Sequence, residues 1–198
     1  MKRKVVRCMQ TIDIYGDHAA CCTVSSDRIH RHNRVRNLVD KIASEGMLSP
    51  IMEKTRLLGD VYGRRPGDVT IPVWRANKGL AIDVAVTSPL AASNLNDSKH
   101  CETYAKTKKH DYYDEDFKGT QFEFAAMVFE TTGGVNAEGL EVLRQLFRFA
   151  AKHQSIQLSV YCGRAWARLA CNIQSSVSQC LLNRAGSLAA IQKDDIFF

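Results

Sequence analysis

Two aspartates stand out in this sequence because of their spacing and their neighbours. Asp68 opens one strand-like segment, and Asp83 lies inside the next, among the apolar residues of Leu80–Val86. A carboxylate inside a buried strand is costly unless it is paired or binds a cation. If the two segments pair through the turn between them, both carboxylates can reach the same end of a sheet. Mg²⁺ takes oxygen ligands and keeps water or a substrate phosphate as further ligands. The pattern therefore predicts a Mg²⁺ or Mn²⁺ site at Asp68 and Asp83.

Other polar residues could complete such a site. Glu53, in the preceding strand-like segment, could supply a third oxygen donor. Lys106, Lys109 and Tyr113 are spaced i, i+3 and i+7, so a helix would place them on one face. A lysine beside a metal-bound water can orient the nucleophile or stabilise charge on a phosphate. Each group also has an ordinary structural interpretation. The aspartates could be turn or salt-bridge residues, and Glu53 and Lys54 could be an exposed pair on a strand. The lysines could form a solvated helix face.

The overall charge favours a polyanionic partner without singling one out. The chain has 198 residues, with 27 Lys and Arg against 21 Asp and Glu, and a formal net charge of +6. Such a balance favours nucleic acid but is shared by many enzymes. No apolar run approaches the roughly 18 residues of a membrane helix, and no apolar signal core follows the basic start. We therefore expect no membrane partner, a nuclear or cytoplasmic protein, and reduced cysteines.

Hydrophobic periodicity predicts an α/β protein with a mixed sheet flanked by helices and a C-terminal helical extension. The turn sequence RANKG is typical of a hairpin between two of the strands. Asn136 is placed to cap one helix, and Gly186 to end the last. The predicted elements are a helix over Arg31–Glu45, strands near Ile51–Leu58, Asp68–Trp74 and Leu80–Val86, a helix near Asp97–Tyr113, a strand over Phe122–Glu130, a helix after Asn136, and a helix near Ser155–Asn183.

The segments RPGDV and AIDVAVTSPL resemble the PD-(D/E)XK nuclease superfamily. More narrowly, the chain is similar to the restriction-like endonuclease at the C-terminal end of some non-LTR retrotransposon polyproteins, which contain a reverse transcriptase. The likeness spans roughly residues 8–185 and includes GDHAACC, RHNRVR, Lys106–Tyr113 and VFETTGG. The resemblance implies a zinc-knuckle-like segment at residues 1–30, a restriction-endonuclease-like core at 31–153 and a helical extension at 154–198.

Carried over to this sequence, the resemblance implies a role for each candidate residue. Asp68 and Asp83 would bind the metal, and Glu53 would be an auxiliary acid. Lys109 or Lys106 would be the catalytic lysine, and Glu130 would line the same site. Apart from the resemblance, we expect Arg31, Arg34, Arg65 and Tyr113 to contact DNA. His30 and His32 flank Arg31 and Arg34, which indicates phosphate contacts or solvated residues and not metal ligands.

The sequence departs from the pattern of the superfamily at two positions. Gly67 separates Pro66 from Asp68, where the pattern has proline and aspartate adjacent. Ala85 stands where the pattern has its lysine, so a lysine from the following helix has to take that role.

The N-terminal segment resembles part of a CCHC zinc site. Cys8, His18 and Cys22 (or Cys21) match the last three ligands, but Val6 stands near the position of the first. A closed zinc site needs four ligands. The alternatives are a zinc site completed by a ligand upstream in a longer parent protein, and a metal-free loop.

Three functional hypotheses follow. The first is a Mg²⁺-dependent endonuclease that nicks DNA and leaves a 3′-hydroxyl able to prime reverse transcription, in a parent polyprotein that also binds the RNA of the element. The second is a nucleic-acid-binding remnant of the same fold that has lost catalysis. The third is a protein interaction module that uses the apolar face of the last helix. The sequence predicts neither a target site nor an oligomeric state.

Overall fold

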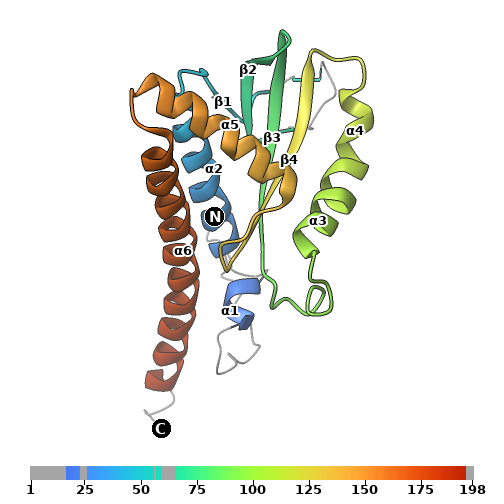
Figure 1. The fold of residues 1–198 in the computed structure, drawn as a ribbon. Helices are drawn as coiled ribbons and strands as arrows, with labels where there is room; N and C mark the ends of the chain where they lie inside the picture. The colour runs from blue at the N-terminus through green and yellow to red at the C-terminus, as the bar shows by residue number, and fades with distance from the viewer. Residues whose placement is uncertain (1–16, 23–25, 56, 59–65, 195–198) are drawn as a thin grey trace.

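The computed structural model describes residues 17–22, 26–55, 57–58 and 66–194 (Figure 1). In this part of the chain, helices pack on both faces of a mixed four-stranded sheet. The elements, in chain order, are α1 (Asp17–Cys21), α2 (Asp27–Glu45), β1 (Ile51–Met52), β2 (Val69–Arg75), β3 (Lys78–Thr87), α3 (His100–Tyr104), the π-helical segment η1 (Ala105–His110), α4 (Asp111–Phe117), β4 (Phe122–Glu130), α5 (Ala137–His153) and α6 (Leu158–Asp194).

The strands follow one another across the sheet in chain order. β1 pairs with β2 and β2 with β3 in antiparallel fashion, whereas β3 pairs with β4 in parallel. β2 and β3 form a hairpin in which Val69 lies opposite Ile82. Ala76 and Asn77 make its turn with φ of 48° and 61°, the left-handed conformation that two-residue hairpin turns favour. The predicted hairpin through RANKG is therefore confirmed.

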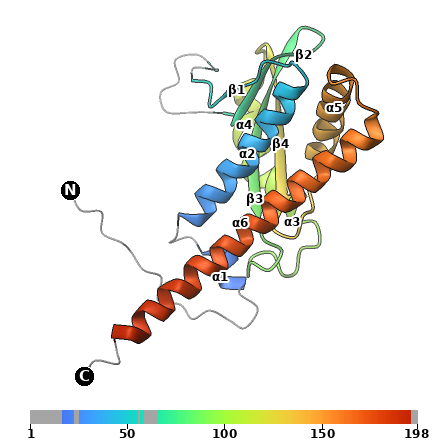
Figure 2. The same ribbon diagram turned by 90° about the vertical axis from the view of Figure 1, so that its left-hand side faces the viewer.

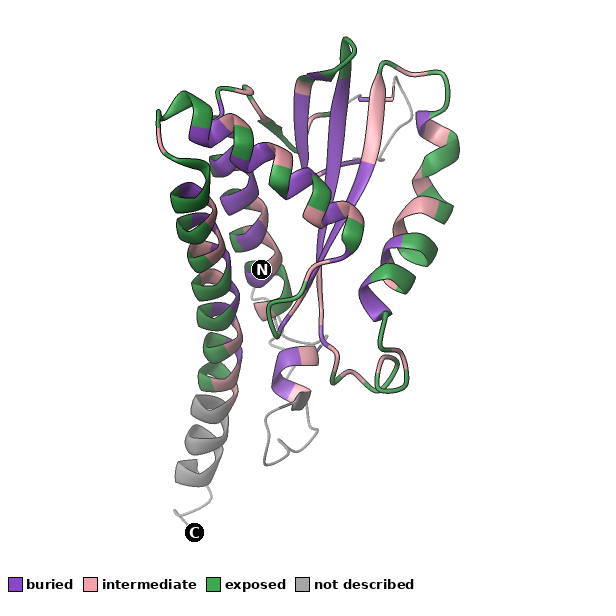
Figure 3. Cartoon of the chain, in the orientation of Figure 1, coloured by how far each residue is buried: buried purple, intermediate pink, exposed green. Residues whose placement is uncertain are grey.

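The main hydrophobic core lies on the sheet face that α2, α5 and α6 cover (Figures 1 and 2). Ile82 and Val84 of β3 contribute to this core, together with Val39 of α2 and Phe147 of α5. Apolar side chains at helical spacing bring these helices onto the sheet, because burying them removes their surface from water. Figure 3 shows buried positions concentrated in the strands and along the helices beside them.

The other face of the sheet is covered by the continuous run of α3, η1 and α4, which connects the parallel strands β3 and β4 (Figure 1). Small side chains make part of this contact: Ala85 and Ala126 of the strands pack with Cys101 and Ala105 of the run. Because helices cover both faces, β3 is buried from Gly79 to Ala85. Alternation along the strand directs the even-numbered residues to the main core and the odd-numbered ones to the α3–η1–α4 run.

The predicted strand near Ile51–Leu58 is mostly absent from the described residues. Only Ile51 and Met52 pair with β2. Glu53 then adopts a positive φ of 45°, which turns the chain out of the extended conformation. Among the described residues, 53–55 and 57–58 of the predicted segment are therefore not a strand.

The last helix is longer than predicted. α6 continues past Gly186 to Asp194, so the prediction that Gly186 ends it is wrong. One internal glycine costs a helix only about 1 kcal/mol relative to alanine. The residues around it are good helix formers such as alanine and leucine, and the helix continues through them.

Asn136 precedes α5 but does not cap it with its side chain. The buried amide instead joins the start of α5 to the edge strand β4. Its Oδ1 accepts the N–H of Val128 at 2.9 Å, and its Nδ2 donates to the carbonyl oxygen of Ala126 at 3.0 Å. The side chain therefore covers backbone groups that an open sheet edge would leave unpaired.

The N-terminal half of α6 packs against α2 and α5 (Figure 2). Tyr161, Ala165, Leu169 and Ile173 all belong to the main core. The interaction-module hypothesis requires this apolar face to be available to a partner, and the packing of α6 contradicts it for these residues. None of the described helices is both long and apolar enough to cross a membrane.

Glu45, at the end of α2, ties that helix to α6. Its Oε2 accepts a hydrogen bond from Arg168 Nη1 at 2.9 Å and another from the Tyr161 hydroxyl. Burial alone would raise the pKa of Glu45, but these two hydrogen bonds outweigh it and lower the pKa. A carboxyl whose pKa falls on folding stabilises the protein above its unfolded pKa, and this contribution is lost as the pH falls through the folded pKa.

We expect Glu45→Gln to lower the free energy of unfolding by about 1–3 kcal/mol near neutral pH, because Arg168 and Tyr161 lose a charged acceptor. The difference from the wild type should narrow as the pH falls below about 4, where Glu45 itself becomes neutral. Urea unfolding followed by circular dichroism at neutral and acidic pH measures both effects. Glu141→Gln on the exposed face of α5 is the matched control. An equal loss at both pH values would contradict a role for the Glu45 charge.

Candidate active site

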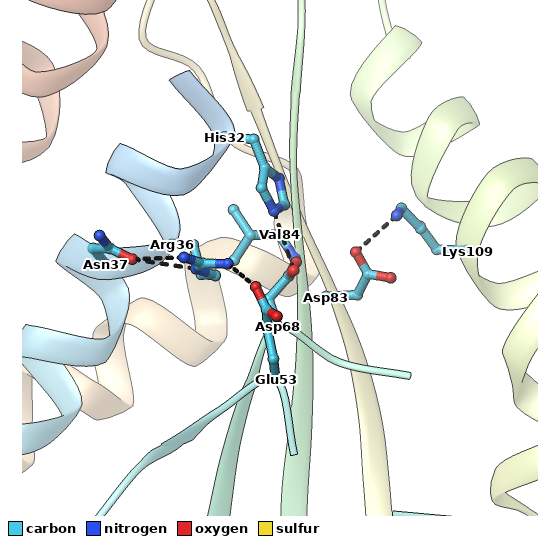
Figure 4. Close-up of polar contacts among 8 residues, drawn as sticks. All are labelled: His32, Arg36, Asn37, Glu53, Asp68, Asp83, Val84 and Lys109. Atoms are coloured by element: carbon cyan, nitrogen blue, oxygen red, sulfur yellow. Dashed lines mark hydrogen bonds and ion pairs between the residues drawn. The ribbon is translucent and has the colours of Figure 1, made fainter. Parts of the chain in front are cut away.

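Asp68 lies immediately before β2, and beyond this point β3 has no β2 residue to pair with (Figure 4). Its N–H donates to the carbonyl oxygen of Ile82 at 2.8 Å, which extends the ladder by one bond. Its carboxylate then substitutes for the missing strand, because Oδ2 accepts the N–H of Val84 at 2.7 Å. This hydrogen bond fixes the Asp68 carboxylate at the edge of β3, beside the position of Asp83.

Gly67 explains how the chain enters this position. Its φ is +96°, and a Cβ there would lie 3.0 Å from the Cβ of Ala81. Only glycine adopts this conformation without strain. The glycine that interrupts the proline–aspartate pair of the superfamily pattern thus allows Asp68 to reach β3.

Asp83 is buried in the middle of β3, and a lysine from η1, in the helical run over this face of the sheet, forms an ion pair with it. Lys109 Nζ lies 2.7 Å from Asp83 Oδ1 (Figure 4). Burial, together with the negative charge of Asp68, raises the pKa of Asp83 even though Lys109 acts in the other direction. The two aspartates are therefore close enough to interact electrostatically, as the sequence predicts. A single lysine leaves this pair with an excess of negative charge.

The π-helical segment η1 determines which lysine reaches Asp83. A π-helix has more residues per turn than an α-helix, which rotates the side chains that follow each turn. Lys109 consequently faces the sheet, whereas Lys106 is exposed to solvent. The α-helical spacing that groups Lys106 with Lys109 and Tyr113 does not apply here. Of the two lysines, Lys109 is the one in contact with Asp83.

His32 joins the site from α2. Its Nε2 lies 3.1 Å from Asp68 Oδ1, so the two oxygens of Asp68 are held by a histidine and by the backbone of β3 (Figure 4). The sequence interpretation, a phosphate contact or a solvated residue, missed this contact. The available signal was the position of His32 one helical turn before Arg36, on a helix expected beside the sheet.

Glu53 lies next to Asp68 along the backbone, but its side chain is engaged elsewhere. Its N–H donates to the Asp68 carbonyl oxygen at 2.9 Å. Its carboxylate forms an ion pair with Arg36, which also bonds Asn37 (Figure 4). The role of Glu53 as an auxiliary acid stays a prediction. The geometry shows it as the partner of an arginine at the outer edge of the site.

The residues predicted to contact DNA differ in accessibility. Arg31 is buried, and its Nη1 donates to the carbonyl oxygen of Ala20 at 2.9 Å, so it links α1 to α2. Arg34 is exposed and lies 3.5 Å from the Ser176 hydroxyl. Tyr113 is half-buried, and burial and the charge of Asp83 raise its pKa. Arg65 lies outside the described residues.

The predicted zinc ligands of the N-terminal segment are only partly described. Cys8 lies outside the described residues, Cys22 is buried, and His18 is partly exposed. Within the described part of the chain, the group of at least three His, Cys, Asp or Glu ligand atoms close enough to hold a metal ion is His100, Cys101 and Glu130. Glu130 therefore lies with these two residues, and not beside Asp83 as the resemblance implies.

Neither a protein-family model nor a curated protein matches this sequence. The resemblance to restriction-like endonucleases consequently rests on the motifs named above. The geometry adds two neighbouring contacts, His32 with Asp68 and Lys109 with Asp83, and the charge of Asp68 is close enough to raise the pKa of Asp83.

We expect Lys109→Met to lower the free energy of unfolding by about 1–3 kcal/mol, because Asp83 is left buried beside Asp68 without its cation. The double variant Asp83→Asn/Lys109→Met should recover much of this loss, which gives a coupling energy of about 0.5–3 kcal/mol in a double-mutant cycle. Chemical unfolding of the four proteins measures it. Lys106→Met is the control and should change stability by less than about 0.5 kcal/mol. Strict additivity of the two substitutions would show that the pair is not coupled.

Proposed function

We propose that this chain is a Mg²⁺-dependent endonuclease that nicks DNA by hydrolysing a phosphodiester bond. The observation that carries the proposal is a buried carboxylate, Asp83, that contacts Lys109 and senses the charge of Asp68 where β2 begins beside β3, a place where a structural role alone would not require a charge. The resemblance of the flanking sequence to restriction-like endonucleases supports the same activity.

The residues at the site fit a divalent cation. Asp83 Oδ1 binds Lys109, and Oδ2 has no hydrogen-bond partner among the described residues. Burial, and to a lesser extent the negative charge of Asp68, raises the pKa of Asp83, and a bound cation would favour its charged form. The Asp68 side chain keeps 18% of its surface exposed, so solvent and a phosphate can approach it. When bound, Mg²⁺ would activate water and neutralise charge on the phosphate.

Lys109 is suited to stabilise charge and not to accept a proton. Burial alone would lower its pKa, but the charge and hydrogen bond of Asp83 outweigh burial and raise it. Lys109 is therefore an ammonium group near neutral pH. Placed beside the scissile phosphate, it would stabilise the negative charge that develops on the phosphoryl oxygens. His32 would act as a positioning residue that holds the Asp68 carboxylate in place.

The proposed reaction balances without a further co-reactant. The oxygen of water forms a bond to phosphorus while the bond from phosphorus to the 3′-oxygen breaks. The 3′-oxygen takes up a proton, which leaves a 3′-hydroxyl and a 5′-phosphate. A 3′-hydroxyl at a nick can prime reverse transcription, which agrees with the role that the resemblance implies for a parent polyprotein.

Nicking of supercoiled plasmid tests this proposal. We expect the full chain to relax the plasmid with Mg²⁺ or Mn²⁺ and not with a chelator. Asp83→Asn and Lys109→Met should each lower the rate by about 10²-fold or more, since each removes charge at the reacting phosphate. Lys106→Met and Asp111→Asn, both on the exposed side of the same helical run, are the matched controls and should nick at the wild-type rate.

The outcomes separate the nuclease from its alternative. Nicking that persists in Asp83→Asn would place the activity elsewhere or in a contaminant. A folded chain that binds DNA but nicks under none of these conditions would support the nucleic-acid-binding remnant. Activity confined to an RNA duplex of the same sequence would change the proposed substrate.

A further inference from the structure

A second polar cluster lies at the far end of the same sheet face. His100 and Cys101 open α3, and Glu130 is the last residue of β4. His100 Nε2 lies 3.4 Å from Glu130 Oε1, and Cys101 Sγ lies 3.7 Å from His100 Nε2 and 3.9 Å from Glu130 Oε1. His100 and Cys101 are buried, whereas Glu130 is partly exposed. Three different ligand types thus converge on one point.

The separation of His100 from Glu130 is long for a hydrogen bond, and all three separations suit the edges of a metal polyhedron. Hydrogen bonds between nitrogen and oxygen in proteins measure about 2.7–3.2 Å, so the contact of His100 with Glu130 is a poor one. Zinc bonds of about 2.0–2.3 Å with tetrahedral angles place nitrogen and oxygen ligands about 3.4 Å apart, and sulfur about 3.6 Å from either. The observed separations of 3.4, 3.7 and 3.9 Å therefore need little adjustment to surround one ion.

The loop after β4 holds the Glu130 carboxylate in the required orientation. Thr132 Oγ1 donates to Glu130 Oε2 at 2.8 Å, so Oε1 is the oxygen directed at His100 and Cys101. Gly134 packs against the same carboxyl group, because a Cβ there would lie 2.8 Å from Glu130 Cδ. Partners that orient a ligand in this way are typical of metal sites.

The cluster is separate from the carboxylates of the candidate active site. Glu130 lies opposite Thr87, four positions along β3 from Asp83. At about 3.3 Å per residue, the two positions are about 13 Å apart. The α3–η1–α4 run, which begins with His100, carries Lys109 to the first site and contributes two residues to the second.

We propose that His100, Cys101 and Glu130 bind a zinc ion through Nε2, Sγ and Oε1, with a water molecule as the fourth ligand. The combination of thiolate, imidazole and carboxylate suits Zn²⁺ and excludes Mg²⁺ and Ca²⁺, which take oxygen ligands. Three protein ligands with an open fourth position are the arrangement of accessible zinc sites. The partly exposed Glu130 gives the ion a path of entry. Bound zinc would fasten the start of the α3–η1–α4 run to the end of β4.

Metal titration of the full chain tests this site directly. After removal of metal with a chelator, Zn²⁺ is titrated in competition with a chromogenic chelator, and Co²⁺ is titrated as a spectroscopic substitute. We expect the wild type to bind Zn²⁺ and to give a sulfur-to-cobalt charge-transfer band in the near ultraviolet. Cys101→Ser should lose the band together with one equivalent of Zn²⁺. Glu130→Gln should keep the fold, as circular dichroism would show, and bind at least about tenfold more weakly.

Two matched cysteine variants control for other thiols. Cys171→Ser, exposed on α6, should bind like the wild type. Cys8→Ser reports any contribution of the N-terminal segment and should leave the Cys101-dependent equivalent intact. The proposal fails if the wild type binds no zinc, or if Cys101→Ser and Glu130→Gln both bind as the wild type does. If Cys101→Ser does not fold, Glu130→Gln decides: unchanged affinity and an unchanged cobalt band in that variant would overturn the proposal.

Discussion

The negative charge of Asp83 inside the central strand constrains the rest of the structure. β3 has a strand on each side and helices over both faces, so Asp83 has little access to water. An uncompensated charge in such a place would cost several kcal/mol. The helical run over this face must therefore bring a cation down to the sheet, and the π-helical turn η1 gives Lys109 that direction. The small residues Ala85 and Ala105 allow the run to pack closely enough.

The two faces of the sheet are stabilised in different ways. On the face of α2, α5 and α6, large apolar side chains form one continuous core. On the other face, the apolar clusters are small, and polar contacts attach the helical run at several points. His100 contacts Glu130 near its start, Lys109 contacts Asp83 in its middle, and His110 Nε2 lies 2.8 Å from Glu138 Oε2 of α5. The candidate active site and the proposed zinc site both belong to this polar attachment.

Local patterns predict the parts of the site that one hairpin brings together. Asp68 and Asp83 flank a turn with a strong signal, and the apolar neighbours of Asp83 mark it as buried. The sequence does not predict which lysine reaches Asp83. An α-helix over residues 106–113 would place Lys106 and Lys109 on the same face, and only the π-helical geometry separates them. His32 and Glu130 depend on the packing of α2 and on the register of β4, both set by distant contacts. The contact of Glu53 with Arg36 likewise depends on the packing of α2, which the sequence around Glu53 does not reveal.

The parallel pairing of β3 with β4 also affects when the site can form. Lys109 and Asp83 are 26 positions apart in sequence, and His32 and Asp68 are 36 apart, so both contacts close long loops of chain. Loop closure costs entropy before native contacts repay it, which makes such topologies slow to fold. In a nascent or partly folded chain, these residues are therefore present but not yet in contact with one another. The chemistry of the site is in this sense a property of the completed topology, which restricts it to molecules that have finished folding.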